Sequence, residues 1–318
     1  MEEKILKILK ESKDGYVSGE EFSKSLGVTR AGIWKHMESL RDIGYEIEAQ
    51  PHLGYRLISV PDKLLAHEIT WNLKTKVIGN KVYSYETIGS TNDRAYELAE
   101  QGVREGTVIV AEEQSSGKGR MGRKWSSPKG GIYLSLILRP GSVPTEISKL
   151  TLVAAVSVAQ AVRSATGLPA LIKWPNDILI GNNKLCGILT ELKAEQDAAV
   201  FVILGIGINV NTKLSLLPKG ATSISKELGR DFSKIDLAKA LLKSIEEHYN
   251  LFKENKFKNI IKEWRNLSAI LGSRVKIIDK ARTIEGQAID IDEAGALVVR
   301  LDTGFSERVL AGDVHLVR

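Results

Sequence analysis

Within the first sixty residues, the spacing of the apolar residues changes from that of a helix to that of a β-strand. This change constrains the fold more than any other feature of the sequence. Apolar residues recur at i, i+4 and i+7 between Ile33 and Leu40, whereas residues 45–49 and 55–58 alternate as strands do. Helices followed by such a hairpin are typical of a winged helix-turn-helix. We therefore predict this fold over residues 1–62.

Polar residues and glycines mark where the predicted helices begin and end. Ser18 and Glu21 have the spacing of a capping box, in which each side chain pairs with a free amide of the other residue. Gly27 supplies the turn, Thr29 can cap the third helix and Gly44 ends it. The third helix is the expected recognition helix.

A recognition helix places its first side chains on base edges, while nearby cations hold phosphates. The residues expected to contact double-stranded operator DNA are Ser18, Thr29, Arg30, Ala31, Trp34, Lys35 and, on the wing, Arg56. Arg30 and Lys35 lie off the apolar face and should point into solvent. The alternatives to DNA binding are a helix face that only contacts solvent and a fold of this shape that binds another protein. The helix-turn-helix motif and the basic residues beside it favour DNA.

The composition is that of an ordinary globular protein. Hydrophobic residues make up 43% and charged residues 26%, and the net charge of +6 favours an anionic partner such as nucleic acid or nucleotide. No apolar run approaches the ~18 residues of a membrane span, and the start lacks a signal peptide. We expect a cytoplasmic protein that does not enter membranes. The single cysteine, Cys186, has apolar neighbours and is expected in the core without a catalytic role.

The remainder of the chain is expected to form two more domains, which makes the whole an α+β multidomain protein. Residues 65–270 mix strand-like runs, such as 107–111 and 200–204, with helical stretches such as 150–166, and predict an α/β domain of catalytic size. From 271 to 318, short strands separated by glycines predict a small β-barrel.

A basic, glycine-rich segment at residues 117–125 has the spacing G-x-G-x-x-G without the context of a dinucleotide-binding turn. Loop-forming residues follow its last glycine, whereas that turn requires a helix there, and Lys118 precedes a glycine, which excludes a P-loop. Its cations are Lys118, Arg120, Arg123 and Lys124. The segment is either a loop that closes over an anion or a mobile surface loop.

Two further segments carry polar groups beside apolar runs. Lys173 and Asp177 on one side, and Lys184 on the other, flank a predicted hairpin turn at residues 181–183 and can converge on one pocket. Residues 205–211 follow an apolar strand, and their glycines and asparagines suit a planar ring packed against backbone. A plain β-bulge is the alternative there.

These motifs together resemble the biotin protein ligases in order and spacing. The matching segments are residues 89–92, Gln114, 117–123, 173–177, 184–189 and 205–209. With the leading helix-turn-helix and trailing β-barrel, the resemblance covers essentially the whole chain and is to the bifunctional ligase-repressor class. It implies a central domain related to class II synthetases and lipoate ligases, and an SH3-like C-terminal β-barrel.

The resemblance also implies site residues. Those implied for biotin are Ser90, Thr91, Asn92, Gln114, Lys118, Gly119, Arg120, Lys184 and Gly187, and those for ATP or the adenylate are Arg123, Trp125, Lys173, Asn176 and Asn209. Lys184, Arg120 and Asp177 are the implied catalytic residues. Hydroxyls and amides suit the neutral ureido ring of biotin. Lys118 stands where the family commonly has arginine, and it keeps the charge without the bidentate fork.

The implied activity has two steps and two partners. Biotin and MgATP form biotinoyl-5'-AMP, and a lysine of the biotin carboxyl carrier protein then takes the biotin; the adenylate also acts as corepressor, with a homodimer binding operator DNA. Asp177 can either assist magnesium or accept the amine proton, and no resident metal site is implied. The alternatives are a non-catalytic transcription factor that senses a small anion, a lipoate-type ligase, and a ligase whose first domain no longer represses.

Overall fold

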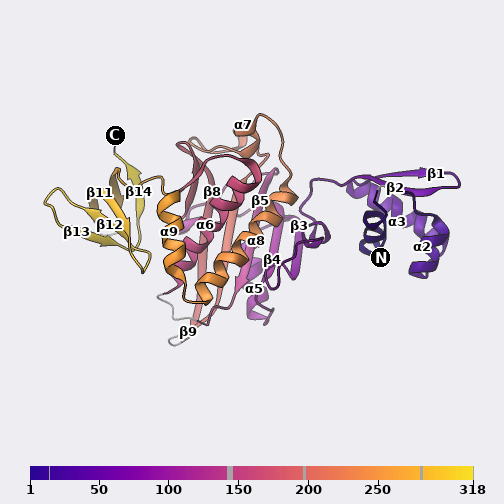
Figure 1. The fold of residues 1–318 in the computed structure, drawn as a ribbon, viewed down its shortest axis with the longest axis horizontal. Helices are drawn as coiled ribbons and strands as arrows, with labels where there is room; N and C mark the ends of the chain where they lie inside the picture. Colours follow the sequence, from indigo (N-terminus) through magenta and orange to yellow (C-terminus); the bar gives the residue numbers. More distant parts are fainter. Residues whose placement is uncertain (14, 142–145, 196–197, 280–281, 318) are drawn as a thin grey trace. The chain divides into compact units, whose positions relative to one another are not determined.

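The computed structural model describes residues 1–13, 15–141, 146–195, 198–279 and 282–317, and the chain divides into two compact units, Met1–Lys63 and Leu64–Arg318 (Figure 1). Among the described residues, no helix combines the length and apolar character needed to cross a membrane.

The first unit is the predicted winged helix-turn-helix. Its elements are α1 (Glu2–Glu11), α2 (Gly19–Leu26), α3 (Arg30–Ile43), β1 (Glu46–Gln50) and β2 (Gly54–Ser59). The apolar face of α3 is buried as its period predicts, and β1 pairs with β2 in antiparallel fashion. The Ser18 hydroxyl accepts from the Glu21 amide at 3.1 Å, and the Thr29 hydroxyl from the Gly32 amide at 3.2 Å. Gly44, with a φ of 116°, ends α3 in the left-handed region.

A seven-stranded mixed sheet forms the body of the second unit. Its strands, in spatial order, are β3 (Lys81–Ile88), β4 (Thr107–Gln114), β5 (Gly131–Leu138), β9 (Ala198–Asn209), β8 (Asn183–Glu195), β7 (Asp177–Ile180) and β6 (Ala170–Lys173). Only the β3–β4 pair among the described strands of this sheet is parallel. The strand-like runs at 107–111 and 200–204 are confirmed as central strands.

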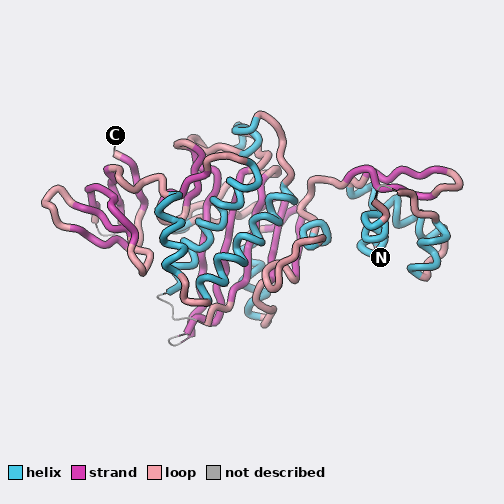
Figure 2. The backbone as a smooth tube through the Cα atoms, viewed as in Figure 1, coloured by secondary structure: helices cyan, strands magenta, loops and turns pink. Residues whose placement is uncertain are grey.

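Helices cover both faces of this sheet (Figures 1 and 2). Their bounds are α4 (Ala66–Thr70), α5 (Thr91–Glu100), α6 (Ile147–Thr166), α7 (Ile224–Leu228), α8 (Lys234–Lys253) and α9 (Phe257–Leu267). Helices α6, α8 and α9 pack on one face and bury the main apolar core. On the other face, α5 buries a smaller cluster that includes Ile109, Ile137 and Phe201. The open part of this second face lies beside the start of α5.

The C-terminal residues form the predicted β-rich domain. Its five antiparallel strands, in spatial order, are β13 (Ser306–Val309), β12 (Leu297–Arg300), β11 (Thr283–Ile291), β10 (Arg274–Ile278) and β14 (Asp313–Leu316). The indole of Trp174 donates to the Gly295 carbonyl at 3.2 Å, and Arg265 of α9 pairs with Asp290 at 2.7 Å. These contacts attach the domain to the larger sheet.

Two local expectations change in the structure, and the basic loop shows one feature that was not expected. Gly205 and Gly207 lie within β9 rather than after the apolar strand, and the register there is continuous, so the β-bulge alternative is wrong. The hairpin turn around residue 181 is confirmed, but Lys173 and Asp177 face each other across a second tight turn between β6 and β7. Within the basic loop, Arg120–Gly122 forms a short 3-10 turn.

Candidate functional site

One pocket lies where the start of α5, the basic loop and the glycine-containing strands meet. Its empty volume is about 780 Å³, including the part open to solvent. The described residues that line it are Ser90, Thr91, Asn92, Gln114, Lys118, Gly119, Arg120, Arg123, Lys124, Trp125, Asn176, Asp177, Lys184, Gly187, Ile188, Leu189, Gly205, Ile206, Gly207 and Asp313. Segments from all over the sequence therefore converge here.

Gln114 organises the neutral end of the pocket by capping α5 from the neighbouring strand. Its Oε1 accepts from the Thr91 amide at 2.8 Å and lies 3.0 Å from the Thr91 hydroxyl oxygen, and its Nε2 donates to Ser127 at 2.8 Å. Ser90 is the N-cap residue of α5, but its hydroxyl makes no cap hydrogen bond. The Ser90 hydroxyl is therefore available to a ligand in the pocket.

Asn92 lines the same end, but its polar atoms are held by the protein. Its Nδ2 donates to Glu191 at 2.5 Å, and its Oδ1 accepts from the Ser135 hydroxyl at 2.6 Å. A Cβ atom at Gly205 would lie 2.2 Å from the Asn92 Oδ1, so this glycine makes room for the amide. The sequence interpretation included neither Ser135 nor Glu191. A serine between two leucines of β5, Leu134 and Leu136, was the available signal for Ser135.

Two more glycines form a flat shelf for an aromatic ring. A Cβ atom would lie 2.4 Å from the Trp125 ring at Gly207 and 2.9 Å at Gly187. The indole Nε1 of Trp125 is buried and, among the described residues, has no hydrogen-bond acceptor. The predicted contact of a planar ring with the glycine backbone is thus made by a side chain of the protein.

Cations from the basic loop and from β8 line the rest of the pocket, and Lys184, Arg120 and Lys118 each contact an oxygen of the protein. Lys184 pairs with Asp177 at 2.6 Å and lies over the Trp125 ring, 5.3 Å from its centroid. Arg120 donates to the Asn176 side chain at 3.1 Å, and burial lowers the pKa of its guanidinium. Lys118 pairs with Asp93. The pocket therefore joins a neutral polar end to a cationic end.

The C-terminal domain completes the cationic end. Asp313 at the start of β14 accepts two hydrogen bonds from Arg123, both 2.8 Å long, and Arg120 reaches the Gly312 carbonyl at 3.5 Å. Arg123 holds the pKa of the Asp313 carboxyl below its usual value. The sequence interpretation did not include Asp313, because 190 residues separate it from Arg123.

The structure does not bring Lys173 and Asn209 to the pocket with the other predicted residues. Lys173 ends β6 opposite Asp177. Asn209 is buried, and its Nδ2 donates to the Thr222 carbonyl at 3.0 Å. Cys186 is buried as predicted, and burial raises the pKa of its thiol.

In the first unit, the predicted DNA-contacting residues fall into two groups. Arg30, Ala31, Trp34 and Lys35 are exposed on α3, with 56% of Trp34 accessible. By contrast, Arg56 is half-buried and pairs with Glu48 at 2.6 Å.

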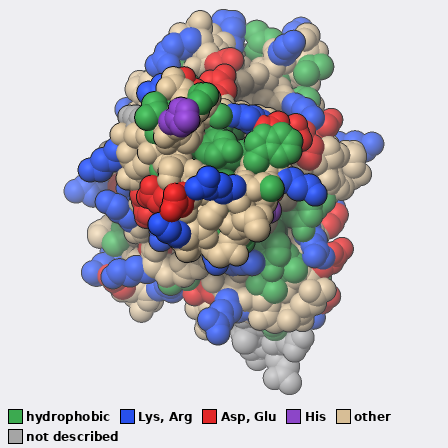
Figure 3. Space-filling view, turned by 90° about the vertical axis from the view of Figure 1, so that its right-hand side faces the viewer, with side chains coloured by type: hydrophobic (Ala, Val, Ile, Leu, Met, Phe, Trp, Pro, Cys, Tyr) green, Lys and Arg blue, Asp and Glu red, His purple; other side chains and the backbone are tan. Residues whose placement is uncertain are grey.

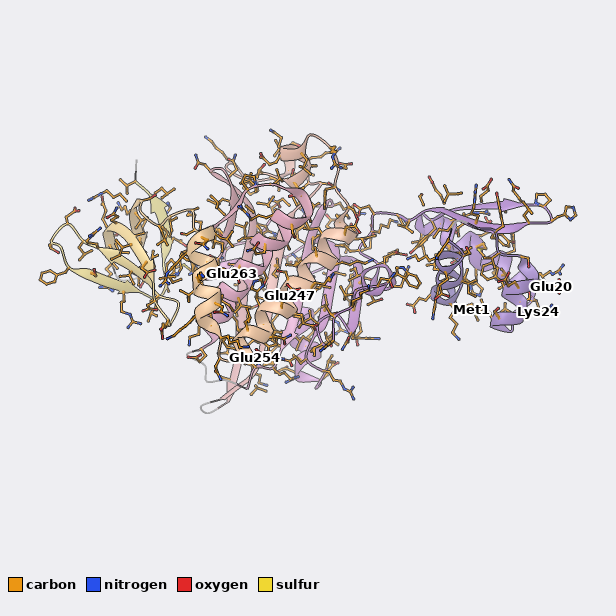
Figure 4. The ribbon with its side chains drawn as sticks, in the orientation of Figure 1. Met1, Glu20, Lys24, Glu247, Glu254 and Glu263 are labelled. Atoms are coloured by element: carbon orange, nitrogen blue, oxygen red, sulfur yellow. The ribbon has the colours of Figure 1, made fainter. Side chains whose placement is uncertain are left out.

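The charges around these residues are mixed rather than purely basic. Arg30 pairs with Glu20 at 3.2 Å, and Glu20 lies beside Lys24 on α2 (Figure 4). On the face shown in Figure 3, basic side chains are likewise spread among acidic and apolar ones. Ser18 and Thr29 act as helix caps.

Comparisons with known families match each part of the chain. Residues 84–209 match the Biotin/lipoate A/B protein ligase family, residues 2–56 match an HTH domain, and residues 270–317 match the Biotin protein ligase C terminal domain. The order of these matches is the order of the three folds described above.

Individual relatives match over nearly the whole chain. The bifunctional ligase/repressor BirA of Bacillus subtilis (strain 168) is 38% identical, covering 98% of this chain and 97% of the relative, and that of Escherichia coli (strain K12) is 32% identical over 94% and 92%. The biotin protein ligase from Aquifex aeolicus in complex with biotin and ATP has a TM-score of 0.65 and 32% identity, covering 75% of this chain and 99% of that one. The chain therefore belongs to the family of bifunctional biotin protein ligases and repressors.

Proposed function

We propose that the pocket beside α5 makes biotinoyl-5'-AMP from biotin and MgATP, and that a lysine of the biotin carboxyl carrier protein then receives the biotin. The observation that carries the proposal is the division of one pocket into a neutral polar end and a cationic end. Biotin has the same division, with a neutral ureido ring and an anionic carboxylate. A relative is bound to biotin and ATP in its solved structure.

In the first step, the biotin carboxylate oxygen attacks the α-phosphorus of ATP, a new P–O bond forms, and the bond to pyrophosphate breaks. Two anions must meet, so fixed cations are the main help that the protein can give. We assign Lys184 to the carboxylate and α-phosphate, and Arg120, Lys118 and Arg123 to the carboxylate and phosphates. Magnesium enters as part of the MgATP substrate.

In the second step, the neutral amine of the carrier lysine attacks the carbonyl carbon of the mixed anhydride, the C–O bond to AMP breaks, and the amine loses a proton. Asp177 orients Lys184 through their 2.6 Å pair and, as a carboxylate of the same pocket, can accept that proton. Gly119, Gly187, Ser90, Thr91, Asn92 and Gln114 are assigned to the biotin end, and Trp125 and Asn176 to the adenylate. Lys173 and Asn209 are not part of this proposal, because they lie outside the pocket.

The same adenylate is proposed as the signal for repression. The exposed side chains of α3 that suit an operator duplex are Arg30, Trp34 and Lys35. The adenylate would favour a homodimer because it would order residues 117–124. We further propose that residues 1–62, 65–270 and 271–318 are the three domains, and that the protein acts in the cytoplasm, where carrier protein and operator are found together.

ATP–pyrophosphate exchange tests the enzymatic part. Purified protein is assayed with biotin, with lipoate and with no acid, and then with carrier protein. We expect exchange only with biotin, followed by labelled carrier. Exchange with lipoate alone would indicate a lipoate-type ligase, and no exchange would indicate a non-catalytic sensor.

Gel shift and sedimentation test the regulatory part. With operator DNA, we expect biotin and ATP together to tighten binding and to convert monomers to dimers. A monomer that binds DNA equally well with and without both substrates would contradict the regulatory proposal and leave the ligase intact.

A further inference from the structure

We infer that Ser135, a fully buried serine on β5, is a positioning residue for biotin, and that it works with Glu191 on β8. The inference rests on the proposed function, because it concerns how the same pocket recognises its acid substrate. Neither residue is among the described residues that line the pocket. Both hydrogen-bond to residues that line it: Ser135 to Thr91 and Asn92, and Glu191 to Asn92.

Ser135 is a buried polar residue whose neighbours along β5, Leu134 and Leu136, are apolar. It has 0% exposure and lies opposite Gly205 on β9 and Ile109 on β4. A buried hydroxyl without partners costs free energy, so its neighbours matter. Its Oγ lies 2.7 Å from the Thr91 hydroxyl and 2.6 Å from the Asn92 Oδ1. The serine thus sits beneath the first turn of α5 and joins two pocket residues.

Glu191 fixes the direction of this chain of hydrogen bonds. A carboxylate only accepts, so Asn92 must present its NH₂ group to Glu191 and its carbonyl oxygen to Ser135. The lack of a side chain at Gly205 lets the amide occupy this place. The orientation of Asn92 is therefore set by two residues outside the pocket.

At its other end the chain reaches the cap of α5. The Thr91 hydroxyl contacts Ser135 at 2.7 Å, and Gln114 accepts from the Thr91 amide at 2.8 Å and donates to Ser127. Hydrogen bonds in such a network support one another, and a half-satisfied network loses more than one bond. Ser135 is the member joined to both Thr91 and Asn92, so removing its hydroxyl loosens two residues of the neutral end at once.

The variant S135A removes one oxygen atom and little volume. We expect the KM for biotin in ATP–pyrophosphate exchange to rise about tenfold, which corresponds to about 1.4 kcal/mol. The KM for ATP should not change, because phosphates are assigned to the cationic end. The variant E191Q keeps the shape but can also donate, so the Asn92 amide can turn over. It should raise the KM for biotin in the same direction by a smaller factor.

Ser157 offers a matched control. It is also buried with 0% exposure, and its hydroxyl donates to the Val153 carbonyl at 2.7 Å. It lies on α6 beside His248, whose ring contacts Glu263 at 3.2 Å, and neither Ser157 nor His248 lines the pocket. Figure 4 labels Glu263 on α9. The variant S157A therefore loses an equivalent hydroxyl without touching the neutral end.

The experiment measures both KM values and the thermal midpoint for the full chain and for S135A, E191Q and S157A. A KM for biotin that rises in S135A and E191Q alone supports the inference. It is overturned if S135A matches S157A, or if the KM values for biotin and ATP rise together. If S135A does not fold, E191Q decides, and an unchanged KM for biotin overturns the inference. A wild-type protein without biotin-dependent exchange would instead remove the proposed function itself.

Discussion

The basic residues of the pocket and those of α3 are held in different ways. In the pocket, Lys184 is fixed by Asp177, and Arg123 by both oxygens of Asp313. On α3, Lys35 is exposed and Arg30 has one exposed partner, Glu20. Fixed cations suit a reaction that needs two anions in one geometry. Adaptable cations suit a duplex whose phosphates repeat and whose binding depends on salt.

A buried ion pair that lies neither in the pocket nor on α3 gives the largest effect expected here, and the effect is on stability. Lys234 at the start of α8 pairs with Glu112, and their side chains are 7% and 11% exposed. We predict that K234M lowers the free energy of unfolding by about 3–5 kcal/mol, because it leaves a buried carboxylate unpaired. Denaturant unfolding measures this. K129M, which breaks the exposed pair of Lys129 with Glu86, is the control, and equal losses would refute the prediction.

Lys184 should show the opposite pattern, with loss of catalysis and little loss of stability. We predict that K184M lowers kcat of adenylation by roughly 10²–10³-fold, as removal of an electrostatic stabiliser does. Pyrophosphate exchange at saturating substrates measures this. K193M is the control, since Lys193 lies on the same strand, is 32% exposed against 35% for Lys184, and pairs with Glu100 outside the pocket. Similar rates for the two variants would exclude a catalytic Lys184.

The sequence predicts these elements well where the signal is local. The apolar spacing of α3, its N-cap at Thr29 and its end at Gly44 depend only on residues close in the sequence. The structure confirms all three. The cations of the basic loop are likewise visible in the sequence. That these cations meet Lys184 in one pocket was implied by the resemblance to the biotin protein ligases. No local sequence pattern predicts it.

The partners of the site residues could not be predicted, because they come from distant segments. Asp313 meets Arg123 only after the C-terminal domain has packed against the larger sheet. Gly205 and Gly207 were expected to follow an apolar strand, with a β-bulge as the alternative; they lie within that strand, where Asn92 and Trp125 pack against them. Tertiary contacts decide such positions, and one sequence does not contain those contacts in readable form.

For the exposed cations of α3, we predict that substitution changes the affinity for operator DNA and leaves the ligase activity unchanged. K35A should weaken operator binding about tenfold and lower the salt slope by about 0.9, if Lys35 neutralises one phosphate. Pyrophosphate exchange should stay at the wild-type rate. Gel shifts at several salt concentrations measure the slope, and K7A on α1, where Lys7 pairs with Glu11, is the control. An unchanged slope in K35A would remove this residue from the interface.

The smallest predicted effect concerns the contact of Asp313 with the basic loop. The pair is partly exposed, with 56% of Arg123 and 34% of Asp313 accessible, so its loss is worth about 0.2–1 kcal/mol. We predict that trypsin cleaves the loop of D313N roughly threefold faster than that of the wild type. Biotin and ATP together should protect both proteins, because the adenylate is proposed to order the loop.

The pH of that assay and its control follow from the same pair. Because Arg123 lowers the pKa of Asp313, the contact is complete above the unfolded pKa of an aspartate and is lost only as the pH falls through the lower folded value. Trypsin works near pH 8, where the contact is intact. D302N is the control, because Asp302 makes an equally direct pair with Arg274 in the same domain, with bonds of 2.8 and 2.7 Å, away from the loop. If D302N speeds cleavage as much as D313N does, the loop responds to the stability of the C-terminal domain, and the cations of the pocket are less firmly fixed than the structure indicates.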